Sequence, residues 1–160
     1  MTTENPRTHN GEGTCRPADL PEFRVVGSRQ FVILVVDDNA VFRRLVTVLL
    51  QRDGYSVLSA SDGQEALQLS REYCGSIDVV ITDQEMPRLT GADLCAHLLA
   101  ERPGIQTILM SGIDMSKTVG HYLGLPFLLK PFDGETLRTR IRAILTAPFQ
   151  PPMYQLPTIR

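Results

Sequence analysis

The amino-acid sequence predicts an α/β protein in which a parallel sheet carries helices on both faces. Short apolar runs of strand length alternate along the chain with longer segments whose apolar residues recur at helical spacing. Five such strand–helix units follow one another, and parallel strands need right-handed crossover connections that place helices over the sheet. Several of the apolar runs stop at a carboxylate, a hydroxyl or a lysine, so polar chemistry is expected where the strands end.

The strands and helices are expected in strict alternation. The five strands are expected at residues 31–36, 55–59, 77–83, 106–110 and 127–129. The first helix has apolar residues at helical spacing, which are Val41, Leu45, Val48 and Leu49. Asp62 is expected to cap a second helix at about 63–73, and a third ends near Arg102, before Pro103-Gly104. A short fourth helix is expected between residues 114 and 122, and the last helix has one apolar stripe, formed by Leu137, Ile141, Ile144 and Leu145.

Length and composition predict one domain with two tails. A chain of 160 residues with 42% hydrophobic content can bury one core, which we expect at residues 29–147. Residues 1–28 are expected to form a flexible lead and residues 148–160 a proline-rich tail. The net charge of −2 gives no sign of a nucleic-acid-binding surface, and no stretch has the length and apolarity of a membrane span.

The N-terminus and the cysteines bear on the compartment. The first residues lack the charged start and apolar core of a secretory signal, so we expect a cytoplasmic protein. Cys15, Cys74 and Cys95 are widely spaced, with no C-x-x-C pair and no histidine at ligand spacing. They predict neither a disulfide framework nor a zinc site.

Acidic residues follow two of the predicted strands. Asp37-Asp38 comes directly after the first strand, and Asp83 ends the third. Ligands of open α/β sheets sit outside the carboxyl ends of the strands, so these carboxylates are expected to converge there. A hard divalent cation stabilises such a cluster, and Mg²⁺ fits best because it needs few protein oxygens and keeps some of its waters. In the alternative interpretation, Asp37-Asp38 only caps the helix that begins near Asn39.

Three residues predict phosphoryl chemistry at the same edge of the sheet. A carboxylate such as Asp83 can accept a phosphoryl group when a cation neutralises the approaching oxygens. Lys130 can bring a positive charge to that group on its long stem, with Pro131 fixing the backbone after it. Ser111, at the end of the fourth strand, can donate a hydrogen bond to a phosphoryl oxygen. Taken singly, Lys130 is also compatible with a solvated surface lysine and Ser111 with an ordinary turn hydroxyl.

Taken together, these motifs closely resemble the receiver domain of two-component response regulators. The likeness runs from about residue 31 to residue 146 and rests on Asp37-Asp38, on Asp83-x-x-Met-Pro with a later glycine, on Ser111-Gly112 and on Lys130-Pro131-Phe132. It implies a flavodoxin-like fold with five helices and a five-stranded parallel sheet of order 2-1-3-4-5. It also implies that Asp83 is the phospho-acceptor and that Lys130 contacts the phosphoryl group. Four further roles follow from it: Asp38 as a direct Mg²⁺ ligand, Asp37 as a ligand acting largely through water, the Glu85 backbone carbonyl as another ligand, and Ser111 with Phe127 as the switch pair.

The resemblance further implies a mechanism and a class of partner. A phosphohistidine, on a sensor histidine kinase or a histidine phosphotransfer protein, would donate its phosphoryl group to Asp83, and slow hydrolysis would follow. Such a protein catalyses only its own modification, and phosphorylation would shift the population between two packings of its surface. Nothing after residue 146 predicts a DNA-binding module, so the output is expected to pass through a protein partner.

Some positions depart from the common pattern of the family. Gln84 stands where an apolar residue is frequent, and we hypothesise that the side chain of Glu85 sets the phosphoryl lifetime. The chain between Ser111 and Lys130 is shorter than in many receivers, which predicts a stunted fourth helix. His97 and His121 are expected to be solvated or packed rather than catalytic.

Three other functions stay open from the sequence. The first is a Mg²⁺-dependent phosphohydrolase with an aspartyl-phosphate intermediate, for which Glu85 is the one candidate general acid. The second is a binding module that has lost the chemistry. The third is the receiver portion of a hybrid histidine kinase.

Overall fold

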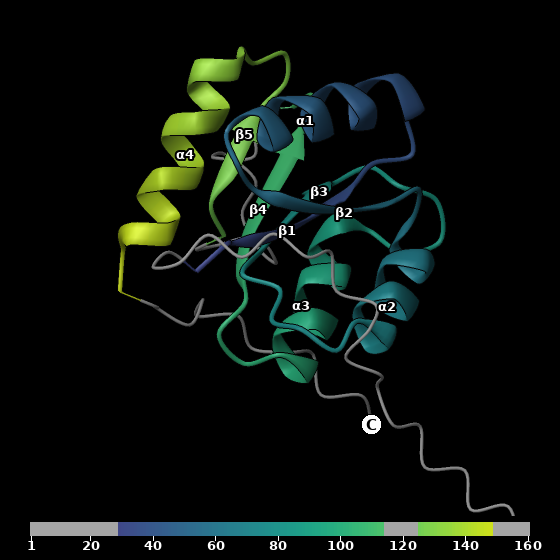
Figure 1. Ribbon diagram of the computed structural model, residues 1–160. Coiled ribbons are helices and arrows are strands. Elements are labelled where there is room, and N and C mark those ends of the chain that lie inside the picture. Colours follow the sequence, from purple (N-terminus) through teal and green to yellow (C-terminus); the bar gives the residue numbers. More distant parts are fainter. Residues whose placement is uncertain (1–28, 114–124, 149–160) are drawn as a thin grey trace, which may run out of the picture.

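The computed structural model describes residues 29–113 and 125–148, which form a five-stranded parallel sheet with helices on both faces (Figure 1). The strands are β1 (Val32–Val36), β2 (Ser56–Ala60), β3 (Val79–Asp83), β4 (Gln106–Ser111) and β5 (Phe127–Leu129). The helices are α1 (Ala40–Arg52), α2 (Gly63–Glu72), α3 (Gly91–Glu101) and α4 (Gly134–Thr146). The strand order is β2-β1-β3-β4-β5, so the flavodoxin-like arrangement is confirmed.

The predicted elements and the observed ones agree closely within the described residues. Every expected strand is present, with ends that differ only slightly from the predicted ones. The described residues contain four helices rather than the expected five. The fifth was expected between residues 114 and 122, which lie outside the described residues, as do the predicted N-terminal tail and all but the first residue of the predicted C-terminal tail.

Helices bury the sheet on both faces, and its central strands β1 and β3 are accordingly mostly apolar. All five residues of β1 are buried, as are all five of β3, and the two strands pair in parallel with Leu34 opposite Val80. Side chains that alternate along β1 enter two separate cores, one containing Leu34 and the other Ile33. A strand covered on both faces must be a nearly continuous apolar run, which is why the sequence identified these strands.

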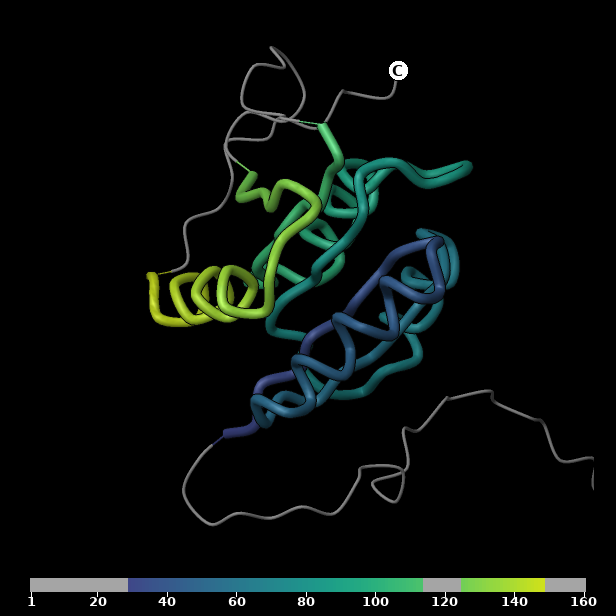
Figure 2. Tube along the Cα trace, turned by 90° about the horizontal axis from the view of Figure 1, so that it is seen from above, coloured from purple at the N-terminus to yellow at the C-terminus, as the bar shows by residue number. Residues whose placement is uncertain are grey.

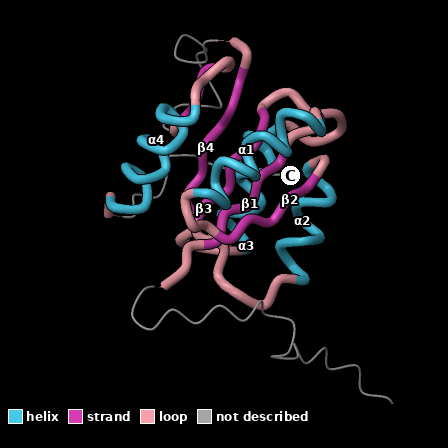
Figure 3. The backbone as a smooth tube through the Cα atoms, turned by 45° about the horizontal axis from the view of Figure 1, so that its top comes forward, coloured by secondary structure: helices cyan, strands magenta, loops and turns pink. Residues whose placement is uncertain are grey.

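Two helices cover each face of the sheet. Side chains of α2 and α3 fill the core that contains Leu34, and side chains of α1 and α4 fill the core that contains Ile33. Figure 3 shows α1 and α4 on one side of the strands, with α2 and α3 on the other. In the view from above, α1 (blue) and α4 (yellow) are set apart from each other (Figure 2).

The apolar stripe expected on the first helix faces the sheet only in part. Val46 and Leu50 are the buried residues of α1, whereas Val41, Leu45 and Val48 are 81%, 53% and 41% exposed. The helix has apolar residues around much of its circumference, so spacing alone could not select the inner face. An apolar surface on α1 is therefore left open to solvent.

The first and second helices begin at the side-chain caps that orient them. Asn39 is the N-cap of α1, where its side chain accepts hydrogen bonds from the amides of Val41 and Phe42. Asp62 caps α2 as predicted, accepting from the amides of Gln64 and Glu65. Capping by Asn39 leaves the carboxylates of Asp37 and Asp38 available for other contacts.

Two of the three cysteines lie within the described residues. Cys95 is a free, buried thiol. Cys74 is disulfide-bonded, so the expectation that the cysteines form no disulfide is wrong for this residue. None of the described helices combines the length and the apolar composition needed to cross a bilayer.

Candidate functional site

The carboxyl ends of the strands bring four predicted site residues to one edge of the sheet. Asp37 follows β1, Asp83 ends β3, Ser111 ends β4 and Lys130 follows β5. Since β1 pairs with β3 and β3 with β4 in parallel, the ends of these strands lie next to one another. The fold thereby gathers residues that are far apart in the sequence.

Three carboxylates form a cluster at this edge. Asp37, Asp38 and Asp83 each offer an oxygen, and these oxygens lie within 4.8 Å of one another. Asp37 and Asp83 are buried, at 1% and 7% exposure, while Asp38 is exposed. The donor set is all oxygen, carries several negative charges and is open to water on one side, which is the chemistry that Mg²⁺ prefers. The residues therefore fit a magnesium ion.

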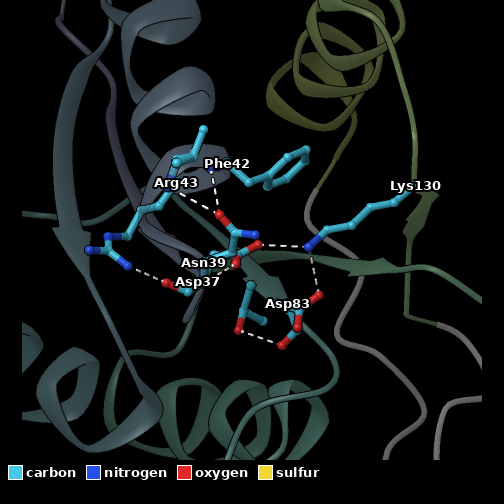
Figure 4. A network of polar contacts seen from close by, with 8 residues as sticks. Asp37, Asn39, Phe42, Arg43, Asp83 and Lys130 are labelled. Atoms are coloured by element: carbon cyan, nitrogen blue, oxygen red, sulfur yellow. Dashed lines mark hydrogen bonds and ion pairs between the residues drawn. The ribbon is translucent and has the colours of Figure 1, made fainter.

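Asp37 is held by contacts to both of its carboxylate oxygens. One oxygen accepts from the backbone amide of Asn39 at 2.8 Å, and the other from Nζ of Lys130 at 2.7 Å. Its backbone carbonyl accepts from the guanidinium of Arg43 at 2.5 Å (Figure 4). A carboxylate fixed in this way is oriented toward the site, and the helix cap is Asn39, so the interpretation in which Asp37-Asp38 merely caps α1 is wrong.

Lys130 lies inside the site rather than on the solvated surface. Its Nζ donates to Asp37 at 2.7 Å and to Asp83 at 2.8 Å, and its side chain is 21% exposed. The same nitrogen lies 4.3 Å from the centroid of the Phe42 ring. The peptide bond between Lys130 and Pro131 is cis. Lys130 thus joins two carboxylates that come from different strands (Figure 4).

The protonation of the site follows from burial and from the excess of negative charge. Burial raises the pKa of Asp83, the charges of Asp37 and Asp38 act in the same direction, and the hydrogen bond and charge of Lys130 oppose them. Burial acts to lower the pKa of Lys130, but its hydrogen bonds to Asp37 and Asp83 outweigh this and raise that pKa. The cluster therefore contains a cationic lysine with more carboxylates than it can neutralise, which favours a bound cation.

The predicted switch residues lie at the neighbouring strand ends. Ser111 is fully buried, and its hydroxyl accepts from the amide of Ile113 at 3.1 Å. Its carbonyl accepts from the amide of Lys130 at 2.7 Å, which links the end of β4 to the residue after β5. Phe127, at the start of β5, is partly buried and packs against the core beneath α2 and α3.

The loop after Asp83 contains a residue that the sequence did not assign to the site. Glu85 is exposed, but Gln84 is 6% exposed and its side-chain oxygen accepts from the amide of Ala92 at 3.0 Å. Gly91 closes the loop against the strand, because a Cβ added there would lie 2.3 Å from the carbonyl oxygen of Asp83. Gln84 and Gly91 therefore fix the start of α3 against the end of β3.

The sequence predicted no catalytic role for either His97 or His121, and it also gave no role to Phe42, which contacts the site. His97 is exposed on α3, as expected for a solvated histidine, and His121 lies outside the described residues. Phe42 received no role from the sequence, yet its ring contacts Lys130. No motif signals this contact, because it joins the first turn of α1 to the end of β5.

Comparison with known proteins agrees with the fold. The response regulator receiver domain family matches residues 33–142, most of the part that the structure describes. The chain belongs to this family.

Individual relatives show how far the similarity extends. A probable transcriptional regulator ycf27 from Porphyridium aerugineum is 38% identical over 116 residues, which cover 71% of this chain and 47% of that protein. The receiver domain of the hybrid histidine kinase CckA is 35% identical, with a TM-score of 0.62, covering 72% of this chain and 99% of that one. The response regulator TrrA from Thermotoga maritima, solved with Mg²⁺ and BeF, is 27% identical, with a TM-score of 0.65 and coverage of 72% and 99%. The chain thus spans about half the length of the curated relative and nearly all of the two solved receivers.

Proposed function

We propose that this protein is the phospho-acceptor of a two-component phosphorelay and that Asp83 takes a phosphoryl group from a phosphohistidine. The observation that carries the proposal is the placement of Asp83. Its buried carboxylate ends a central strand, lies in a cluster with Asp37 and Asp38, and accepts a hydrogen bond from Lys130 at 2.8 Å. A nucleophile, a set of cation ligands and a positive charge for the phosphoryl oxygens are thus gathered at one edge.

In the proposed step, a carboxylate oxygen of Asp83 attacks the phosphorus atom. The O–P bond forms as the P–N bond of the phosphohistidine breaks, and the electron pair stays on the imidazole nitrogen, which then takes up a proton. Lys130 is already at the carboxylate, where its ammonium can donate a hydrogen bond to an oxygen of the incoming group. The cation, held by Asp37, Asp38, Asp83 and the Glu85 carbonyl, supplies the remaining charge neutralisation when it is bound. The complex of TrrA with Mg²⁺ and BeF supports this assignment.

The phosphoryl group would act as a switch on the neighbouring strand ends. It brings about −1.5 to −2 charges to a point beside Ser111 and Lys130. We infer that the Ser111 hydroxyl turns from the Ile113 amide to a phosphoryl oxygen, and that Phe127 moves into the space this opens. The output is a shift between two packings of the surface, read by a protein partner.

The exposed apolar surface of α1 supports a protein phosphodonor. Val41, Leu45 and Val48 lie exposed on the helix that begins directly after Asp37-Asp38. A histidine-bearing partner that covered this surface would bring its phosphohistidine to the acidic edge. An apolar stripe at helical spacing suits a helix of the partner, and we propose that a sensor histidine kinase or a phosphotransfer protein docks there.

Two alternative functions, a hybrid histidine kinase and a phosphohydrolase, would make different demands on the same site. The similarity to the CckA receiver makes a place within a hybrid kinase the second candidate, with the same chemistry at Asp83. A phosphohydrolase would need a general acid held against the leaving group, and its one candidate, Glu85, is exposed. We therefore propose that the protein catalyses only its own phosphorylation and dephosphorylation.

The proposal is tested by following the intact mass of the purified protein during incubation with acetyl phosphate and Mg²⁺. We expect the wild type to gain the mass of one phosphoryl group and then lose it slowly once the donor is removed. Asp83→Asn, and wild type with the cation chelated, should gain nothing. Continued release of inorganic phosphate far beyond one equivalent, without an adduct, would show a phosphohydrolase instead.

A further inference from the structure

Phe42 presents the face of its ring to the ammonium of Lys130. The Nζ atom lies 4.3 Å from the ring centroid, well within the range of a cation–π contact. Figure 4 shows the ring beside the lysine nitrogen, with Asp37 and Asp83 as the hydrogen-bonded partners. The ammonium is thus in contact with two carboxylates and an aromatic face.

The ring is fixed in this orientation by its own neighbours. Phe42 meets Phe132 edge to face, with centroids 5.5 Å apart and an interplanar angle of 78°, an arrangement that aromatic pairs favour. It also packs against the core beneath α1 and α4. Phe132 follows Lys130 by two positions, so the same segment contains both the lysine and the aromatic side chain that orients the Phe42 ring.

The ring differs from the two carboxylates in how it holds the cation. Hydrogen bonds from Lys130 to Asp37 and Asp83 are directional and occupy N–H donors. The ring attracts the charge through its quadrupole and leaves those donors free. When Asp83 becomes phosphorylated, one hydrogen bond of Lys130 must change partner, and the ring can keep the ammonium in place while it does.

We propose that Phe42 is a positioning residue that confines the Lys130 ammonium to the point where it meets the phosphoryl group. The proposal rests on the proposed role of Asp83 as acceptor. Phe42 touches no reacting atom and acts through Lys130 alone. Weakening the attraction of the ring should slow phosphorylation while leaving the fold intact.

The position of the ammonium is measured first, by a method that needs no phosphorylation. The chain has two lysines, Lys117 and Lys130, so Lys117→Arg leaves one lysine ammonium signal in a ¹⁵N-lysine-labelled sample. Protons above a ring face are shifted upfield, and we expect this for Lys130 and its loss in Phe42→Leu. An unshifted signal, or one that Phe42→Leu leaves unchanged, would overturn the proposal.

The effect on reactivity is then measured with fluorinated phenylalanines at position 42, which weaken the quadrupole and keep the ring. The logarithm of the acetyl phosphate rate should fall steadily with each added fluorine, and Phe42→Leu should be about three-fold to ten-fold slower, as expected for a partly desolvated cation–π contact. The matched control is the same series at Phe31, whose ring lies 5.8 Å from the guanidinium carbon of Arg29 outside the site. That series should leave the rate unchanged.

The two measurements separate failure of this proposal from failure of the proposed function. A wild type that never gains a phosphoryl group would refute Asp83 as acceptor, and the lysine signal would still decide whether the ring holds Lys130. A wild type that is phosphorylated at a rate insensitive to fluorination would refute the positioning role and leave the receiver function standing. Equal slowing by fluorine at Phe31 and at Phe42 would show a general effect of the substitution and would also overturn the proposal.

Discussion

α1 and α3 cover opposite faces of one sheet, yet they use their apolar residues differently. In α3 the buried residues run along most of the helix, namely Gly91, Ala92, Leu94, Cys95, Ala96 and Leu98. In α1 only Val46 and Leu50 are buried, and three large apolar side chains are exposed. Solvent exposure of such side chains has no stabilising value for the isolated domain. The difference shows that α3 buries most of its apolar residues in the core, whereas α1 leaves three of them exposed, on the face where we propose that the phosphodonor docks.

The largest expected effect is on stability, in a matched pair of leucine substitutions. Leu94→Ala should lower the free energy of unfolding by about 2–5 kcal/mol, because Leu94 is fully buried and its truncation leaves a cavity. Leu45→Ala should change it by less than ~0.5 kcal/mol, as expected for a surface position. Both values are measured by chemical denaturation, under the condition that the free energy of unfolding falls with denaturant concentration at the same slope in both variants.

Cys95 reports independently on the same helix. Burial raises the pKa of its thiol to about 12, so alkylation at pH 8 should be negligible until α3 opens. We expect Leu94→Ala to accelerate alkylation of Cys95 and Leu45→Ala to leave it unchanged. Similar losses of stability in the two variants would contradict the division of roles between α1 and α3.

The second effect is on phosphotransfer. Leu45→Asp should slow transfer from a histidine phosphotransfer protein about ten-fold, the effect of losing ~1.4 kcal/mol at a central contact. Its rate with acetyl phosphate should remain that of the wild type, because the small donor needs no docking surface. Thr139→Asp, on an exposed position of α4, is the control. Equal slowing with both donors would mean that the substitution had disturbed the site.

The third prediction concerns the stability cost of the buried acidic residue Asp83 and how that cost depends on pH. Since burial raises the pKa of Asp83, the folded state binds a proton more tightly than the unfolded chain does. The ionised Asp83 carboxylate therefore does not destabilise the fold below the pKa that it has in the unfolded chain. The destabilisation grows as the pH rises from that value to the raised pKa of the folded state, and it is fully present above it. Without divalent cations, Asp83→Asn should melt at a higher temperature than wild type at pH 7, with a smaller difference at pH 4. Added Mg²⁺ should stabilise the wild type more than the variant; a variant that is the less stable at pH 7 would contradict this.

The smallest effect concerns Glu85, whose exposed side chain follows the acceptor. Its removal should change the hydrolysis rate of the phosphorylated protein about two-fold to five-fold, since exposed charges contribute ~0.2–1 kcal/mol. Glu85→Ala and Glu85→Gln would both speed hydrolysis if the charge repels the attacking water. Only Glu85→Ala would slow it if the side chain orients that water. Equal rates in all three proteins would refute any role of the side chain.

The sequence predicted the features that depend on local pattern. The strands were found because burial on both faces requires continuous apolar runs, and Asp37, Asp38 and Asp83 were found because such runs end there. The exposed face of α1 was missed because apolar residues surround much of that helix, and the choice of inner face depends on how it packs on the sheet.

Long-range contacts account for the rest of what the sequence missed. The contact between Phe42 and Lys130 joins segments that only the folded sheet brings together. Gln84 was noted as a departure from the family, but its bond to the Ala92 amide depends on the exact placement of α3. Neither contact has a signature in residue spacing.

The most direct test of the central claim is to identify the residue that carries the phosphoryl group. Borohydride reduces an acyl phosphate at an aspartate to homoserine, which peptide mass spectrometry locates. After reaction with acetyl phosphate and Mg²⁺, we predict homoserine at position 83 and at no other aspartate. Homoserine at Asp37 or Asp38, or a phosphate that resists borohydride on Ser111 or a histidine, would contradict the assignment of Asp83 as the acceptor.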